Sequence, residues 1–290
     1  MSKDRLVITG ETGFVGSHLV HSFSEKSNIV SINRRELLNR QNVSQLVVPS
    51  LAQDLHSIAE RVPLESTFIH CAASINPKEV GDYWSANVVA TRELLELAVA
   101  RKAKQFILFS TGGVYGYRDG ELAQETDSLD PIGIYGHSKV LAEQLANMYS
   151  QEYGLNVVVF RLYFPFAEGQ RKGIFPLIKS SIKNRSMLTL NVDGAPKLQP
   201  VHCDDIVSAV EQAMDKCPEG YRVYNLCGDE VFSFADLVDE YALARGVTAS
   251  VKQSTNTVGD LLACNRLLKK ELEWRPEVSC KEFIRFDANA

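Results

Sequence analysis

A tyrosine and a lysine four residues apart form the most reactive pairing in this 290-residue chain. Tyr135 and Lys139 lie in the stretch Tyr-Gly-His-Ser-Lys, and residues spaced by four share one face of a helix. The lysine ammonium can therefore lie beneath the phenol, where its charge favours the phenolate and lowers a pKa that is about 10 in water. We expect Tyr135 to exchange a proton with a substrate oxygen near neutral pH. The alternative is a solvated pair on a helix surface.

A glycine-rich turn near the N-terminus is typical of a phosphate-binding site. It follows the apolar run 6–8 directly and opens a helix that we predict over residues 14–25. Glycines allow a tight turn and let the backbone approach a pyrophosphate at the positive end of the helix. A purely structural turn is the alternative. The residues that we assign to this turn are Gly10, Thr12, Gly13, Phe14, Val15 and Gly16.

The end of the second predicted strand, at residues 29–32, bears on which dinucleotide would bind. Chains that bind NAD carry an acidic residue about twenty positions after the first glycine, and here that position is Asn33. Arg34 and Arg35 follow it, and a guanidinium can hold a 2′-phosphate through charge-assisted hydrogen bonds. The sequence therefore predicts NADP, with NADPH as the reductant. NAD stays open as the alternative.

The spacing Gly-x-x-Gly-x-x-Gly, continued as Gly-Phe-Val-Gly-Ser-His-Leu, resembles the extended short-chain dehydrogenase/reductase family. That family includes NAD-dependent nucleotide-sugar epimerases, dehydratases and ketoreductases. The stretch Ser-Thr-Gly-Gly-Val-Tyr-Gly at 110–116 is similar to the family's segment Ser-(Ser/Thr)-x-x-Val-Tyr-Gly. The resemblance implies an NAD(P)-dependent enzyme in which Thr111 hydrogen-bonds the reacting oxygen. It also implies that Thr111, Tyr135 and Lys139 form the catalytic triad.

The same resemblance implies further contacts with the cofactor. Ser50 and Leu51 fill the place of a pair that faces the adenine, in preference to the Asp-Leu pair at 54–55. Asn87 lies in a stretch similar to the family's Asn-Val-x-Gly-Thr, and we expect it to tie secondary structure together rather than take part in chemistry. The cofactor positions implied in this way are Ser50, Leu51, Cys71, Ala72, Ala73, Asn87, Ser110, Tyr135, Lys139 and Tyr163.

Departures from the family pattern bear on the substrate. The 4,6-dehydratases carry an Asp-Glu pair just after the catalytic threonine, whereas this chain has Gly112 and Gly113, which disfavours dehydration. Phe164, Leu198 and Thr257 replace an asparagine and two arginines that clamp the diphosphate of a nucleotide sugar. The cations that we expect to compensate for these losses are Lys179, Lys183, Arg185 and Lys197.

The leading hypothesis is therefore the NADPH-dependent reduction of a keto-sugar, a nucleotide-linked 4-keto-6-deoxy sugar being the favoured substrate. One alternative is an NAD-dependent nucleotide-sugar epimerase. Another, of a different class, is a regulator that senses NADP without catalysis. The triad argues against the regulator.

The elements that must position these residues alternate between strands and helices. Short apolar runs at 6–8, 29–32, 46–48, 68–70, 106–109 and 157–160 predict buried strands, and the helices between them include 82–102. This alternation predicts an α/β fold with a doubly wound parallel sheet, the Rossmann class. We expect residues 1–165 to form the dinucleotide-binding domain. Residues 166–290, with helices near 175–184, 204–215 and 233–245, form a small C-terminal substrate-binding lobe, and some of its segments return to the sheet.

Composition narrows the partners and the compartment. A net charge of −5 without a long run of like charges argues against nucleic acid and against an anionic membrane. The six cysteines and the pair His18 and His21 fit no metal pattern, and scattered thiols indicate the cytoplasm. The family resemblance implies a homodimer built from the helices near 82–102 and 136–152.

Overall fold

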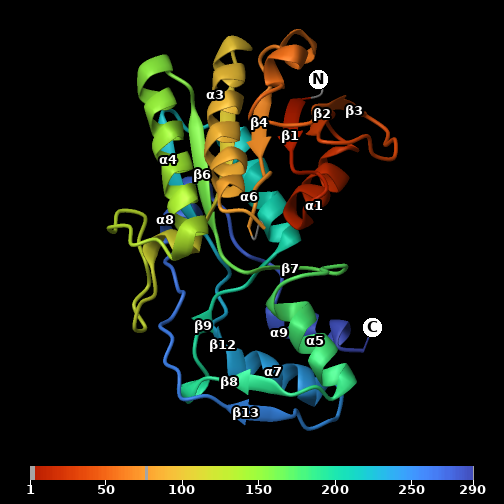
Figure 1. Ribbon diagram of the computed structural model, residues 1–290, viewed down its shortest axis with the longest axis vertical. Coiled ribbons are helices and arrows are strands. Elements are labelled where there is room, and N and C mark those ends of the chain that lie inside the picture. The colour runs from red at the N-terminus through yellow and green to blue at the C-terminus, as the bar shows by residue number, and fades with distance from the viewer. Residues whose placement is uncertain (1–3, 76–77, 290) are drawn as a thin grey trace.

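The computed structural model describes residues 4–75 and 78–289, and its centre is a seven-stranded parallel sheet (Figure 1). The strand order is β11-β6-β5-β4-β1-β2-β3, so the chain crosses over the sheet in both directions from β1. β1 is buried on both faces, with Leu6, Val7 and Ile8 at most 1% exposed, as expected of a parallel strand. The strands are β1 (Arg5–Thr9), β2 (Asn28–Asn33), β3 (Val43–Val47), β4 (Thr67–His70), β5 (Gln105–Thr111), β6 (Val157–Leu162) and β11 (Tyr221–Leu226).

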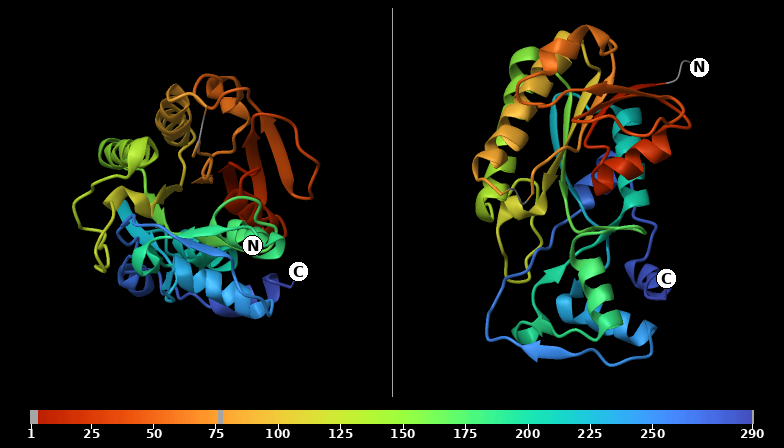
Figure 2. Two further views of the ribbon diagram at one scale, coloured as in Figure 1. Left: turned by 60° about the horizontal axis from the view of Figure 1, so that its bottom comes forward. Right: turned by 45° about the vertical axis from the view of Figure 1, so that its right-hand side comes forward.

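Helices cover both faces of this sheet (Figure 2). One face packs against α1 (Phe14–Phe23), α6 (Cys203–Lys216) and α8 (Arg266–Glu271). The other packs against α3 (Ala90–Ala100), α4 (Gly133–Tyr153) and the 3₁₀ helix η1 (Leu55–Arg61). The sheet is thus packed between two helical layers. In such sheets, ligands bind at the carboxyl ends of the parallel strands.

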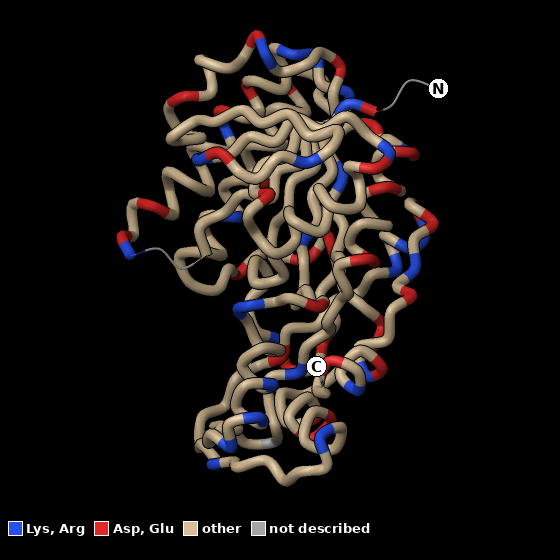
Figure 3. Tube along the Cα trace, turned by 90° about the vertical axis from the view of Figure 1, so that its right-hand side faces the viewer, with Lys and Arg blue, Asp and Glu red and all other residues tan. Residues whose placement is uncertain are grey.

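A smaller lobe lies beyond the carboxyl edge of the sheet (Figures 1 and 2). It has its own apolar core, in which Phe166, Leu198, Leu237 and Tyr241 are buried. Basic and acidic residues are interspersed over both parts of the molecule (Figure 3). Within the described residues, no helix is long and apolar enough to cross a bilayer. The elements below the sheet are β7 (Pro165–Phe166), α5 (Ile174–Asn184), β8 (Leu188–Leu190), η4 (Val192–Gly194), β9 (Lys197–Leu198), β10 (Val201–His202), β12 (Phe232–Ser233), α7 (Phe234–Ala244), β13 (Val251–Gln253) and α9 (Cys280–Asp287).

The predicted fold class is confirmed, and the structure corrects some boundaries. The first helix ends at Phe23 because the following residues turn back toward β2, with the amides of residues 26 and 27 bonded to the Phe23 carbonyl. The helix predicted over 82–102 consists of α2 (Gly81–Tyr83), a π-helical segment η2 (Trp84–Val89) and α3. Such π segments are frequent at functional sites, and this one contains Asn87. The sheet also takes its edge strand, β11, from the C-terminal half of the chain.

Candidate functional site

The glycine turn between β1 and α1 presents bare backbone to a ligand. A Cβ on Gly10 would lie 2.6 Å from the amide nitrogen of Ala72, and one on Gly16 would lie 2.1 Å from the carbonyl oxygen of Gly10. Gly10 also has a φ of 84°, which side chains disfavour. Gly13 precedes α1 without a side-chain cap, and the first turn of the helix holds no acid. The free amides at this positive helix end fit a pyrophosphate, so the turn suits a dinucleotide.

A chain of hydrogen bonds ties the ends of neighbouring strands together beside this turn. The Thr91 hydroxyl donates to the Asn87 carbonyl (2.7 Å), so it accepts from Nε2 of His70 (3.0 Å). Nδ1 of His70 then accepts from the Thr9 hydroxyl (2.7 Å). Burial lowers the pKa of His70 to about 3, so the ring is neutral, and the nearby Lys139 charge acts in the same direction. The arrangement fixes the end of β4, where the segment Cys71 to Ala73 begins.

Asn87 joins that segment to α4, the helix that carries Tyr135 and Lys139. Its Oδ1 accepts from the amide of Ser74 (2.7 Å), and its Nδ2 donates to the Ser74 carbonyl and to the Ser138 hydroxyl, each at 2.9 Å. Both amide hydrogens and one lone pair of the amide oxygen are thus used within the protein. Asn87 thus acts as the expected tie between elements, and it lies between the cofactor turn and α4.

Thr111 ends β5 and caps a short 3₁₀ helix, η3 (Gly112–Tyr115), by accepting a hydrogen bond from the Gly113 amide (3.2 Å). The carbonyl of Gly113 accepts from the amide of Ile132 (2.8 Å), directly before α4. The turn after Thr111 is therefore joined to the start of the helix that carries Tyr135. Gly112 is required here, since a Cβ would lie 2.2 Å from the ring of Tyr163. Tyr163 itself is almost fully buried against this turn.

Burial shifts the pKa of Tyr135 and the pKa of Lys139, both on α4, in opposite directions. It raises the pKa of Tyr135 to about 12, and Tyr83 adds to that rise. It lowers the pKa of Lys139 to about 8, although the charge of Glu143 opposes the change. Desolvation of the phenolate is the largest cause of the Tyr135 shift, and the lowering expected from Lys139 and a bound nicotinamide stays a prediction for the cofactor complex. At physiological pH the Tyr135 phenol of this structure is therefore neutral.

A buried polar network behind Lys139 escaped the sequence analysis. Glu143 and Arg161 form an ion pair in which both side chains are at most 6% exposed, with Nη2 and Oε2 2.7 Å apart. Nη1 of Arg161 donates to the Tyr115 hydroxyl (2.6 Å), which donates to Oδ1 of Asn225 (2.8 Å). Ser110 donates to Glu143 as well. The spacing of Glu143, four residues after Lys139, is the one local signal that could have indicated it.

The adenosine end of the candidate site lies where β2 and β3 finish. Arg34 and Arg35 are exposed there, while Asn33 is buried. Nδ2 of Asn33 donates to Oε2 of Glu11 (3.2 Å), a residue of the glycine turn that the sequence analysis did not select. Ser50 and Leu51 follow β3 and are partly buried. Asp54 belongs to the alternative pair for the adenine site. Its carboxylate accepts a hydrogen bond from the Ser50 amide (3.1 Å), so it stabilises the turn after β3.

Two of the three positions that lack the family's diphosphate clamp, Phe164 and Leu198, take part in apolar packing, whereas Thr257 is exposed. Leu198 is 1% exposed and belongs to the core of the lobe. Phe164 packs against the core of the lobe and against a small apolar cluster that contains Tyr163, and its φ of 33° is strained for a bulky residue. Of the cations expected to compensate, Lys179 is held by Asp287, with Nζ and Oδ1 2.7 Å apart. Lys183, Arg185 and Lys197 are exposed.

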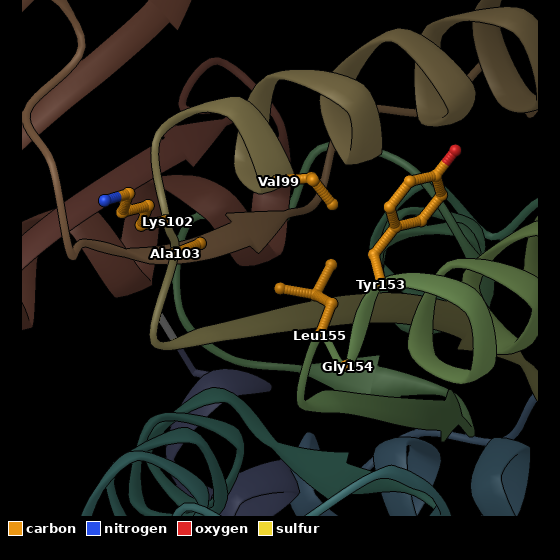
Figure 4. Close-up of a pocket in the computed structure, with 6 residues that line it drawn as sticks. All are labelled: Val99, Lys102, Ala103, Tyr153, Gly154 and Leu155. Atoms are coloured by element: carbon orange, nitrogen blue, oxygen red, sulfur yellow. The ribbon is translucent and has the colours of Figure 1, made fainter.

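One shallow cavity, of about 270 Å³, lies between the C-terminal ends of α3 and α4 (Figure 4). Its lining includes Val99, Tyr153 and Leu155. Tyr135 and Tyr153 are eighteen residues apart on one helix, which places the cavity about 27 Å from Tyr135 along α4. The cavity is therefore separate from the candidate catalytic site.

Comparisons with known proteins agree with this geometry. The model of the NAD dependent epimerase/dehydratase family matches residues 6–227. An uncharacterized UDP-glucose epimerase of Bacillus subtilis is 26% identical over 88% of this chain and 87% of its own length. A dTDP-4-dehydro-6-deoxyglucose reductase of Escherichia coli is 26% identical over 95% of this chain and 94% of its own length. The structure of MoeE5 in complex with UDP-glucuronic acid and NAD is 25% identical, covers 97% of this chain and 96% of its own, and superposes with a TM-score of 0.85.

Proposed function

The chain belongs to the NAD dependent epimerase/dehydratase family, as an NAD(P)-dependent enzyme of the extended short-chain dehydrogenase/reductase type, and from this premise we propose that it reduces a keto-sugar with NADPH. The favoured substrate is a nucleotide-linked 4-keto-6-deoxy sugar. The similarity to a reductase that acts on a dTDP-linked 4-dehydro-6-deoxyglucose supports this choice. Gly112 and Gly113 support it too, because they offer no acid for a dehydration step.

The link between the turn after Thr111 and the start of α4, which carries Tyr135, is the observation that carries the proposal. A phenol with a pKa of about 12 keeps its proton at neutral pH, so it can donate that proton to the oxygen of a carbonyl under reduction. Thr111 orients the same oxygen through its hydroxyl. Lys139, one helical turn after Tyr135, supplies positive charge where an alkoxide develops. The reduced nicotinamide, when bound, supplies the hydride for the carbonyl carbon.

The residues that would hold the dinucleotide form one continuous edge of the sheet. The glycine turn takes the pyrophosphate, and Ala72 lies against it. Asn33, Arg34 and Arg35 meet the ribose end, where the two guanidiniums favour a 2′-phosphate. Other cofactor positions lie at the carboxyl ends of β3, β4, β5 and β6, while Asn87 lies on η2 and Tyr135 and Lys139 lie on α4. The six free thiols support a location of the enzyme in a reducing compartment, which we propose is the cytoplasm.

An epimerase that oxidises and re-reduces one carbon with a retained NAD is the second candidate. The similarity to an uncharacterized UDP-glucose epimerase favours it. The oxidative half of that reaction needs a base, so it would require Tyr135 in its phenolate form.

The experiment that separates these functions is a screen of nucleotide-linked 4-keto-6-deoxy sugars against the purified protein, followed by the absorbance of NADPH. Stoichiometric, ketone-dependent consumption of NADPH is the expected result. Interconversion of UDP-glucose and UDP-galactose without net consumption of cofactor would instead identify an epimerase. Cofactor binding with no turnover of any substrate class would favour a regulator.

A further inference from the structure

Glu11 is a buried carboxylate inside the glycine turn, a place where the chain otherwise presents bare backbone. It is 5% exposed. Its Oε2 accepts hydrogen bonds from the Ser31 hydroxyl and from Nδ2 of Asn33. Ser31 and Asn33 lie on β2, and Asn33 is the last residue of that strand. The Glu11 side chain therefore links the glycine turn to the end of β2, where we expect the ribose to bind.

The contact also sets the orientation of Asn33. A carboxylate only accepts hydrogen bonds, so the amide nitrogen of Asn33 must face Glu11. Nδ2 donates to Ser31 as well (2.9 Å). No described residue donates to Oδ1 of Asn33, and that oxygen is not among the buried unpartnered atoms. The strand end thus offers the ribose a neutral acceptor, with a negative charge directly behind it.

We infer that Glu11 is a specificity-determining residue that opposes NADP by supplying, from the glycine turn, the negative charge that position 33 lacks. A carboxylate at the ribose end repels a 2′-phosphate, and burial limits the screening of this repulsion by salt. The exposed Arg34 and Arg35 attract the same phosphate. The preference for NADPH over NADH is then the attraction of the 2′-phosphate by the two arginines minus its repulsion by Glu11. Glu11 therefore makes that preference smaller than the arginines alone would.

Arg40 modulates this charge. Its Nε lies 4.0 Å from Oε1 of Glu11, and its side chain is 43% exposed. The guanidinium therefore neutralises part of the carboxylate at Oε1, the oxygen that Asn33 does not contact. Removing Arg40 would leave the charge of Glu11 without this partner. NADPH binding would then weaken because Glu11 repels the 2′-phosphate more strongly.

The inference rests on the dinucleotide site of the proposed function, and direct binding of cofactor tests it without turnover. Dissociation constants for NADPH and NADH are measured by fluorescence on the full chain and on Glu11→Gln, which keeps the shape and the acceptor oxygen but removes the charge. We expect the affinity ratio of NADPH to NADH to rise at least threefold, with NADH affinity changed less than twofold. Glu152→Gln, an equal change of charge at the exposed C-terminal end of α4, should leave the ratio unchanged.

A double-mutant cycle tests the part assigned to Arg40. Arg40→Gln should lower the ratio in the natural chain and leave it unchanged in Glu11→Gln. An equal drop in both backgrounds would show that Arg40 acts on the phosphate itself and would overturn its coupling to Glu11.

The outcomes also separate this inference from the proposed function. A ratio that stays constant or falls in Glu11→Gln overturns the inference, as does an equal loss of both cofactors, which would mean that Glu11 only supports the turn. A natural chain that prefers NADH contradicts the NADPH proposal, and Glu11→Gln must still move the ratio toward NADPH. Failure to bind either cofactor would overturn both.

Discussion

Burial makes Tyr135 and Lys139 chemically different from the same residues in water. The phenol holds its proton more tightly, with a pKa of about 12, and the ammonium holds its proton less tightly, with a pKa of about 8. Both shifts come from the same desolvation, which disfavours whichever form is charged. At neutral pH the pair is thus a neutral acid beside a cation, which suits the delivery of a proton to a developing alkoxide.

The clearest test at the scale of a residue is Tyr135→Phe, which removes only the phenolic oxygen. If Tyr135 delivers the proton, turnover with a keto-sugar should fall about 100-fold or more. NADPH affinity, measured by fluorescence, should stay within a few-fold, because the phenol contributes little to uniform binding. Unchanged turnover would mean that another group supplies the proton. Loss of NADPH binding as well would point to a structural role.

The arginine pair after β2 gives a second prediction at this scale. If Arg34 and Arg35 hold a 2′-phosphate, NADPH should bind at least about tenfold more tightly than NADH, which corresponds to about 1.4 kcal/mol. Replacing both arginines by alanine should remove most of that difference while NADH affinity stays unchanged. Calorimetric titration of both cofactors measures the effect. Equal affinities in the natural chain would contradict the NADP assignment.

Among the elements, the carboxyl edge of the sheet depends on polar links as well as on packing. His70 joins β1 to α3 through Thr9 and Thr91, and Asn87 then joins the π-helical segment to α4. The network of Glu143 and Arg161 joins α4 to β6. We propose that residues 1–165 work as a dinucleotide-binding domain completed by β11, α6 and α8. The rest of the C-terminal half then forms the substrate lobe.

The neutral His70 should make stability depend on pH. Its pKa is about 3 in the folded chain, whereas an unfolded histidine titrates near 6.5, so below that value only the unfolded state takes up the proton. The free energy of unfolding should therefore fall between pH 7 and pH 5 by about 2 kcal/mol from this group alone. His70→Gln, which can still bond both threonines, should lack that component in urea denaturation at the two pH values. An identical pH dependence in both chains would contradict the assignment.

For the whole molecule, the outer face of the α3 and α4 layer exposes apolar side chains that a partner could cover. Trp84 and Val89 lie on η2, and Leu141, Met148 and Tyr153 lie on α4, each between 36% and 61% exposed. We propose that two copies pair through this face, since such symmetric contacts are the commonest way for enzymes to assemble.

Light scattering should give twice the chain mass of 32.3 kDa at micromolar concentration. Met148→Glu places a charge in the proposed interface and should shift the mass to that of a monomer. The matched control is Leu243→Glu, a leucine 73% exposed on α7 of the lobe, which should remain a dimer. A monomeric natural chain would contradict the proposal.

Local patterns in the sequence were sufficient for the central strands, for the glycine turn and for the spacing of Tyr135 and Lys139, because each depends on neighbours within one element. What only the tertiary structure decided involves residues that are far apart in the chain. Tyr115 meets Asn225 across 110 positions, and β11 reaches the sheet edge only once the chain has crossed the lobe. The direction of the Tyr135 pKa shift belongs to the same group, since it depends on how much protein surrounds the phenol. Glu11 shows the reason most directly: its carboxylate is placed by Ser31 and Asn33 on another strand, and no spacing along the chain reports that contact.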